Sequence, residues 1–458
     1  MKKIIYLLAL QFFILNTGNA QETFLRQIDV LNDDYGTYIC PTKDDGYIIT
    51  GVTNAENNNE DIVLVKTNKY GDTLWAKVFG GEKQEDSFCV LETMDNGYII
   101  AGYSNSFGDF TWRSYIIKTD EYGDTTWTRT FDGLLEHIIQ TQDSCYFLVG
   151  INSSSLIKKM DNSGNVLWSK NYNYCKRFME SEEISENRIA VVGISNLEVP
   201  PYSTTIDLFI SNTNGDSISF NQYGGVNMYN YLSIEQTLDK GFILSATESY
   251  YFEYSNIYLQ KIDSLCNSQW VKTFGNEYSF DYAKSVVQTS DSCFVVTGDR
   301  DDLGLILLKT DGLGNLMWEK GFDFNSMNTY GNCIKNTDDN HIIVVGAASG
   351  NYPPPRPKDI LLIKTDNDGL ITNIFDGQED NKKDSFIYPN PNNGTFTLHL
   401  SENDQYVKVL SLNGKPVFEK QLNFTKNQTL SIKNIDKGCY IIMVKTIDGL
   451  KSEKVLIY

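Results

Sequence analysis

One pattern recurs seven times between residues 21 and 383, and this repeat constrains the fold more than any other feature of the sequence. Its clearest landmark is a short apolar run that ends in Gly or Ala, at Gly51, Gly102, Gly150, Gly193, Ala246, Gly298 and Gly346. Successive landmarks lie 43 to 53 residues apart. A period in this range indicates a supersecondary unit that buries its apolar face against neighbouring copies, as in a propeller or a solenoid.

Each unit reads as four short strands. A second landmark ends at Trp75, Trp127, Trp168, Trp270 and Trp318, while repeat four is expected to substitute Phe220 and repeat seven Asn373. Thirteen residues before the first landmark, several repeats carry a small residue: Cys89, Ser233, Ser285 and Cys333. Small side chains suit the crowded axis of a propeller. We therefore predict an all-β fold, a seven-bladed β-propeller with four-stranded blades, and keep a linear β-solenoid as the alternative.

The Asp-rich runs between the third and fourth strands, such as Thr119–Asp124, are interpreted as hairpin turns. Asp closes an Asx-turn and Gly supplies the positive φ. These runs lack the ligand spacing of a calcium loop. They also differ by one residue in spacing from the Asp-box of sialidase-type propellers and from the tryptophan repeat of pyrroloquinoline-quinone propellers. We expect no metal and no cofactor.

Closure of the ring leaves two candidates for the last strand. Phe24 lies 27 residues before Gly51, the spacing that separates Trp75 from Gly102, so residues 23–30 align with a fourth strand that lacks the first three. Residues 370–375 compete for the same place in blade seven. The sequence leaves both open.

Charge and composition divide the chain. Residues 1–20 have two lysines, an apolar run and a small-residue end at Ala20, as a secretory signal peptide does. The chain carries −20, and from Asp384 onward nine lysines face seven acids, so residues 21–383 carry −24. We expect a leader at 1–20, a propeller at 21–376, a linker at 377–384 and a second domain at 385–458. An acidic passenger disfavours nucleic acid, and no transmembrane segment is expected after the leader.

The last 75 residues resemble the C-terminal sorting domain of type IX secretion substrates of Bacteroidetes. The matching positions, in order, are Tyr388, Pro389, Asn390, Pro391, Gly394, Asn413, Gly414, Gly438 and Tyr440. The alternating pattern here predicts a small β-sandwich. The resemblance implies recognition by the type IX machinery and a secreted or outer-membrane surface location, reached through the periplasm. The propeller repeats in turn resemble a broad group of secreted bacterial and archaeal propellers, which implies a fold and not an activity.

Histidine and cysteine give little sign of catalysis. The chain has three His, and His137 falls in the small-residue slot near the axis, where a core or pore-lining role is expected. The eight Cys are spread through a large domain and are not packed into a short one. Cys145 and Cys293 share one repeat position and Cys89 and Cys333 another, and other blades have Gly, Ser or Ala there, so we favour buried small side chains over disulfides.

Candidate binding residues lie in the loops between blades and between strands two and three, which open on one side of a propeller. They are Trp112, Tyr251, Tyr282, Tyr330, Asp86 and Asp281. Aromatic faces beside carboxylates suit sugars or protein partners. We therefore expect a binding, adhesion or scaffold module for a glycan or protein, with no catalytic residues assigned. The alternative is a propeller hydrolase or lyase that uses paired carboxylates.

Overall fold

The computed structural model describes residues 23–31, 33–55, 59–107, 111–173, 175–185, 187–196, 204–224, 228–250, 254–275, 278–322, 327–350, 358–371, 387–388, 395–399, 404–411, 416–421, 427–432, 438–446 and 450–457. The chain separates into two compact units, Met1–Phe375 and Asp376–Tyr458. The leader expected at 1–20 lies outside the described residues. Among the residues that are described, no helix has the length and apolar character needed to cross a membrane.

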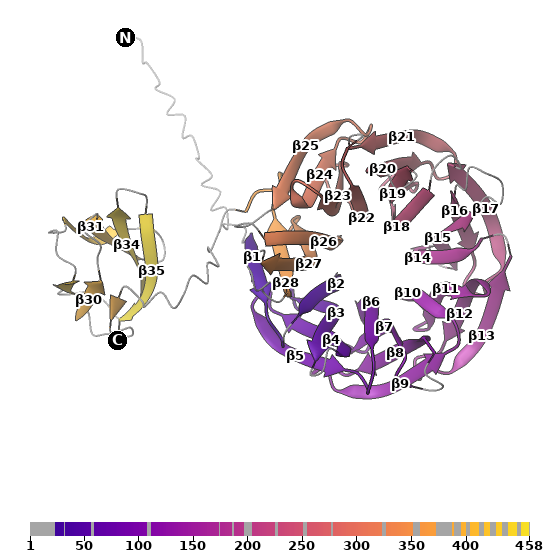
Figure 1. Cartoon of the computed structure of the whole chain (residues 1–458), viewed down its shortest axis with the longest axis horizontal. Coiled ribbons are helices and arrows are strands. Elements are labelled where there is room, and N and C mark those ends of the chain that lie inside the picture. The colour runs from indigo at the N-terminus through magenta and orange to yellow at the C-terminus, as the bar shows by residue number, and fades with distance from the viewer. Residues whose placement is uncertain are drawn as a thin grey trace, which may run out of the picture. The chain divides into compact units, whose positions relative to one another are not determined.

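The first unit is a ring of seven four-stranded antiparallel sheets, which confirms the predicted propeller (Figure 1). Blade one comprises β2 (Asp34–Pro41), β3 (Tyr47–Ala55), β4 (Asn59–Thr67) and β5 (Thr73–Phe79). Blade two comprises β6 (Glu85–Glu92), β7 (Tyr98–Ser104), β8 (Arg113–Thr119) and β9 (Thr125–Phe131). Blade three comprises β10 (Leu134–Gln140), β11 (Tyr146–Asn152), β12 (Ser154–Met160) and β13 (Val166–Tyr172).

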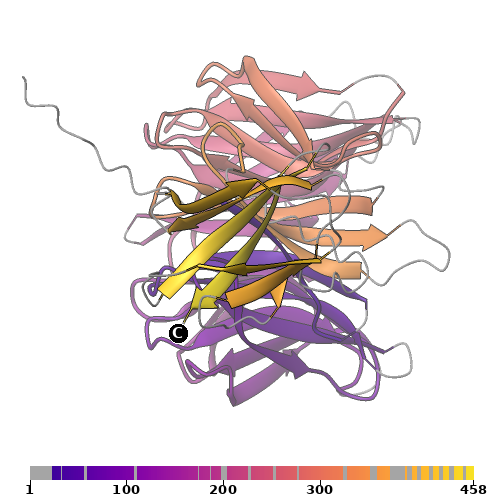
Figure 2. The same ribbon diagram turned by 90° about the vertical axis from the view of Figure 1, so that its left-hand side faces the viewer.

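Blades four to seven continue the same order. Blade four comprises β14 (Arg177–Ser185), β15 (Arg188–Asn196), β16 (Thr204–Ser211) and β17 (Ser217–Gly224), and blade five comprises β18 (Met228–Gln236), β19 (Phe242–Tyr250), β20 (Tyr254–Ile262) and β21 (Ser268–Phe274). Blade six comprises β22 (Asp281–Gln288), β23 (Phe294–Arg300), β24 (Gly304–Thr310) and β25 (Leu316–Phe322). Blade seven includes β26 (Met327–Asn336), β27 (Ile342–Gly350) and β28 (Lys358–Thr365). The first strand of each blade lies nearest the axis (Figure 1), and the strands run across the thickness of the ring (Figure 2).

An N-terminal strand closes the ring. β1 (Phe24–Ile28) pairs antiparallel with β28 and so supplies the fourth strand of blade seven. Phe24 lies opposite Lys364 in this pairing, as Trp75 lies opposite Lys66 in blade one. The first of the two candidates for closure is therefore the correct one.

Burial follows the position of a strand in its blade. The middle strands are buried along most of their length, as in β7 and β8, because adjacent blades cover both of their faces. The outermost strands β5, β9 and β21 alternate between exposed and partly buried residues, since only one face meets the protein. The apolar runs of the sequence thus mark the second and third strands.

The hairpins between the third and fourth strands are Asx-turns, as predicted. In blade two, the Asp120 carboxylate accepts hydrogen bonds from the backbone N–H groups of Tyr122 and Asp124, both at 2.9 Å. Gly123 follows with a φ of 78°, and a Cβ there would lie 2.7 Å from the ring of Trp75 in blade one. The glycine is therefore required twice, by its backbone conformation and by the neighbouring indole.

Blade four corrects one prediction about this contact. Ser219, and not Phe220, takes the register of the tryptophan, because Ser211 pairs with Ser217 as Thr67 pairs with Thr73. Phe220 packs instead into a core cluster beside Trp168. In blade five, the hairpin between β20 and β21 has Cys266 at a φ of 66° where other blades have glycine, since no indole of blade four lies against it.

The second unit contains two antiparallel sheets. One is β29 (Ile387–Tyr388), β30 (Thr395–His399) and β33 (Asn427–Ser431). The other is β32 (Pro416–Gln421), β31 (Asp404–Ser411), β34 (Gly438–Thr446) and β35 (Leu450–Ile457). Tyr388 ends β29, Gly438 begins β34 and Tyr440 is buried within it. The other motif residues, Pro389, Asn390, Pro391, Gly394, Asn413 and Gly414, lie outside the described residues.

Candidate functional site at the two ends of the axial channel

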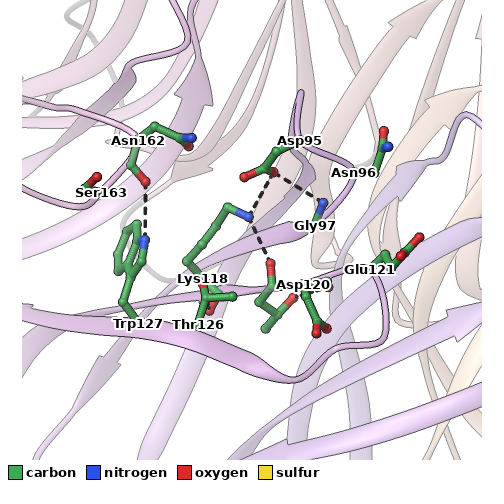
Figure 3. A pocket seen from close by; sticks show the side chains of 11 residues that line it. Asp95, Asn96, Gly97, Lys118, Asp120, Glu121, Thr126, Trp127, Asn162 and Ser163 are labelled. Atoms are coloured by element: carbon green, nitrogen blue, oxygen red, sulfur yellow. Dashed lines mark hydrogen bonds and ion pairs between the residues drawn. The ribbon is translucent and has the colours of Figure 1, made fainter.

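A buried lysine near the end of the third strand recurs in six blades and belongs to the fold. The third-strand lysines and the fourth-strand residues that face them are here called the outer layer. In blade two, Lys118 Nζ lies 3.0 Å from Asp95 Oδ1 and donates to the carbonyl of Thr119 at 2.9 Å (Figure 3). The surrounding cavity of about 400 Å³ also contains Trp127, whose indole N–H donates to the carbonyl of Asn162 in the next blade. Equivalent ion pairs join Lys66 to Asp44, Lys159 to Asp143, Lys261 to Asp239, Lys309 to Asp291 and Lys364 to Asp339. We therefore interpret the pocket of Figure 3 as part of the repeat.

One end of the axial channel, here called the mouth, is formed where the innermost strands begin. Each of these strands has a bulge near this end, and the residues before the bulge occupy equivalent positions. In blades one, two, four, six and seven these residues are Tyr35, Asp86, Arg177, Tyr282 and Tyr330. The mouth is thus one part of the ring where equivalent positions carry different side-chain chemistry.

Lys284 joins three blades at the mouth. Its ammonium lies 5.8 Å from the ring centroid of Tyr231 and 5.9 Å from that of Tyr330, and it forms an ion pair with Asp299 at 2.7 Å. The Tyr231 ring meets the Tyr282 ring edge-on at a centroid distance of 6.3 Å. Tyr231 is 50% exposed and Tyr330 is 37% exposed. The arrangement presents open aromatic faces that are held in place by a cation.

The opposite side of the mouth is acidic. Glu136 accepts a hydrogen bond from the Tyr103 hydroxyl. It also forms an ion pair with Arg177, in which Oε1 of Glu136 lies 2.6 Å from a guanidinium nitrogen. Burial, followed by the charges of Glu60 and Glu136, raises the pKa of Asp86 to about 6. Asp86 therefore gains or loses its charge just below neutral pH.

The remaining predicted residues have different positions. Asp281 is fully buried, and its carboxylate pairs with Arg300 at 2.8 Å and accepts from the Ser279 hydroxyl, so it does not reach the surface. Trp112 is 44% exposed and precedes β8, at the same end of its blade as the mouth. Tyr251 lies outside the described residues.

A chain of side chains crosses the axis below the mouth. The Tyr38 hydroxyl lies 3.1 Å from His137 Nε2, and that nitrogen lies 4.0 Å from Glu180 Oε1. Lys335 places its ammonium 4.9 Å from the Tyr38 ring centroid. Burial, and then the charge of Lys335, lowers the pKa of His137 to about 3, so the imidazole is neutral. The predicted pore-lining position of His137 is confirmed, because it is buried and lines the axial cavity.

The other end of the channel is a cavity of about 590 Å³, here called the axial cavity, lined by the innermost strands of all seven blades. Glu180 and Glu182 accept hydrogen bonds from the backbone N–H groups of Ile234 and Gln236 in blade five, at 2.8 and 2.6 Å. Glu235 accepts in the same way from Gln288 in blade six, at 3.1 Å. These carboxylates therefore join three consecutive innermost strands.

Burial disfavours the charged form of these acids. It raises the pKa of Glu182 to about 7, and the charges of Glu235 and Glu180 act in the same direction. Burial, with a smaller effect from Glu180, raises the pKa of Glu235 to about 7. A carboxyl pair for the hydrolase alternative would lie here, although each acid already has a structural partner.

Sequence reasoning missed most of the axial cavity. Tyr38 and Glu180 stand thirteen residues before Gly51 and Gly193, in the slot where other blades have Cys or Ser. Counting back from every landmark would have found them beside His137. The seven cysteines whose side chains the structure describes are free, as the repeat pattern favoured.

Comparisons with known proteins address the fold and the C-terminal region. Residues 386–458 match the secretion system C-terminal sorting domain, which confirms the resemblance. No curated protein matches the chain. The structure described as RRP9 WD40 repeats is 9% identical, with a TM-score of 0.52 over 74% of this chain and 96% of that one.

Two further solved structures are similar. That of U3-55K is 9% identical, with a TM-score of 0.51 over 74% of this chain and 98% of that one. The β-propeller domain of the Trilobed protease from Pyrococcus furiosus is 13% identical, with a TM-score of 0.45 over 75% and 100%. Identities this low relate folds and not functions. The chain thus combines a seven-bladed β-propeller with a secretion system C-terminal sorting domain, which implies export through the type IX secretion system.

Proposed function

We propose that this protein is a binding module displayed outside the cell, whose ligand, a glycan or a protein, contacts the mouth of the propeller. The observation that carries the proposal is a cluster from three blades, in which Lys284 lies over the rings of Tyr231 and Tyr330, and Tyr282 meets the Tyr231 ring edge-on. Sugars stack apolar ring faces on tyrosine, and tyrosine is also enriched at protein interfaces. The exposed Trp112 extends the aromatic character of this side of the ring.

Export supports the same proposal. The sorting domain implies handling by the type IX machinery, and we propose attachment of the propeller to the outer-membrane surface as the result. An acidic propeller is repelled by anionic surfaces, so neutral, hydroxyl-rich or cationic partners fit it best.

The test is a glycan and protein array probed with the full chain and with Tyr282→Ala/Tyr330→Ala. Removal of two ring faces is expected to lower the affinity for the bound ligand at least tenfold. Tyr122→Ala is the matched control, because Tyr122 is 64% exposed on a hairpin at the other end of the blade. Equal binding by the double variant, or no ligand for the wild type on any array, would contradict the proposal.

A further inference from the structure

We propose that the axial cavity is a second binding site, which takes a small organic cation carrying a primary ammonium group. The site is separate from the mouth, because its lining residues come from the opposite halves of the innermost strands. Ligand binding in the axial cavity therefore does not depend on whether the mouth binds a glycan or a protein.

Room in the cavity comes from the repeat. In blades five, six and seven the residues thirteen before the landmark are Ser233, Ser285 and Cys333, whose short side chains leave the axis open on that side. The volume of about 590 Å³ lies within the range of small-molecule sites.

The cavity also offers acceptor oxygens. Glu182 and Glu235 each use one carboxylate oxygen for a backbone N–H, and among the described residues their second oxygens have no hydrogen-bond partner. Each carboxylate can therefore accept a further donor. A charged ammonium donor forms a stronger hydrogen bond with a carboxylate than a hydroxyl does.

An ammonium already occupies one side of the cavity. Lys335 stands over the face of Tyr38, next to Glu180. This one lysine is outnumbered in the cavity by Glu92, Glu180, Glu182, Glu183 and Glu235. The excess of carboxylates favours a second cation over an anion. No group of three acidic, Cys or His side chains within the described residues has the geometry for a metal ion, so the geometry points to an extended organic cation.

The test compares 1,4-diaminobutane with 1,4-butanediol, which has the same length and no charge, by titration calorimetry on the full chain at pH 8. We expect the diamine to bind at least tenfold tighter than the diol. Glu182→Gln/Glu235→Gln keeps a carbonyl oxygen for both backbone N–H groups and removes the charges. It should weaken diamine binding at least tenfold, since charged hydrogen bonds are lost.

Glu121→Gln is the control, because Glu121 is an exposed acid that does not line the axial cavity. Lys335→Met removes the resident ammonium and is expected to strengthen diamine binding. Equal affinities for diamine and diol, or unchanged diamine binding by the folded double variant, would overturn the proposal. Tight binding of the diol alone would assign the cavity to sugars instead.

Discussion

The outer layer of the ring and its axis follow different rules. In the outer layer, six blades repeat one lysine–aspartate pair. Phe24 and the five repeat tryptophans each lie against a glycine of the following blade. At the axis, equivalent positions hold Tyr38, His137 and Glu180 where other blades have Cys or Ser. Residues that repeat are explained by the packing of blades, whereas residues that differ are candidates for function.

Blade four departs from the repeat in the outer layer and also supplies acidic side chains to the axis. It has Ile210 in place of the lysine and Ser219 in place of the tryptophan, and it supplies Glu180 and Glu182 to the axial cavity. The blade that departs most from the outer pattern thus contributes more carboxyl groups to the axial cavity than any other blade.

The largest expected effect is loss of ring closure. Deletion of residues 23–28 removes β1, leaves the edge of β28 unpaired and uncovers Gly71, which packs on Phe24. We expect a fall in melting temperature of about 10 °C or more, or failure to fold, because buried strand pairing is lost. Differential scanning calorimetry measures it, with Gln27→Ala as the control at an exposed position of the same strand. A deletion variant that melts like the wild type would refute closure by β1.

The second effect tests the contact between glycine and indole. Gly123→Ala places a Cβ against Trp75 and forces a positive φ, so we expect a loss of about 1 to 3 kcal/mol in the free energy of unfolding. Cys266→Ala, at the hairpin that faces Ser219, should cost less than about 1 kcal/mol. Urea denaturation of both variants provides the comparison, and equal losses would contradict the account of blade four.

The third effect concerns the buried lysines. Lys118→Met leaves the Thr119 carbonyl without its donor and Asp95 without its cation, so we expect a loss of about 1 to 3 kcal/mol. Asp95 is half exposed, which places the loss below that of a fully buried pair. Lys77→Met breaks an exposed pair with Asp124 and should cost less than about 1 kcal/mol. Urea midpoints that do not separate the two variants would argue against a special role for the outer layer.

The fourth effect is a pH dependence at the axis. Glu182 and Glu235 have folded pKa values of about 7, above the ordinary 4.5, so the folded protein binds more protons than the unfolded chain between these limits. Stability from these groups is therefore lost as pH rises from about 4.5 to 7. Glu182→Gln/Glu235→Gln should match the wild type near pH 4 and exceed it by on the order of 2 kcal/mol at pH 8. Urea denaturation of the double variant and the wild type at each pH measures this difference in the free energy of unfolding. A difference that is the same at both pH values would contradict the prediction.

The sequence predicted the parts of the molecule that repeat. Seven landmarks gave the blade count, the Asp-rich runs gave the hairpins, and Phe24 gave one of two candidates for closure. Prediction was weaker where a single residue departs from the pattern. Phe220 was assigned to the tryptophan register because it is the nearest aromatic residue, and only strand pairing places Ser219 there.

The site was harder to predict for a related reason. Tyr282 and Tyr330 meet through Lys284 and Tyr231, and contacts between side chains of different blades do not follow from spacing along the chain. Asp281 looked like a loop acid, but its position at the start of β22 buries it against Arg300.

The most direct test of the contrast between the outer layer and the channel is to measure the melting temperature and ligand affinity of Tyr282→Ala/Tyr330→Ala in the same preparation. The account predicts a melting temperature within about 2 °C of the wild type, because these rings are part exposed. It also predicts at least tenfold weaker binding of the array ligand. A large fall in melting temperature with unchanged binding would contradict the account, since the mouth would then serve the fold and not the ligand.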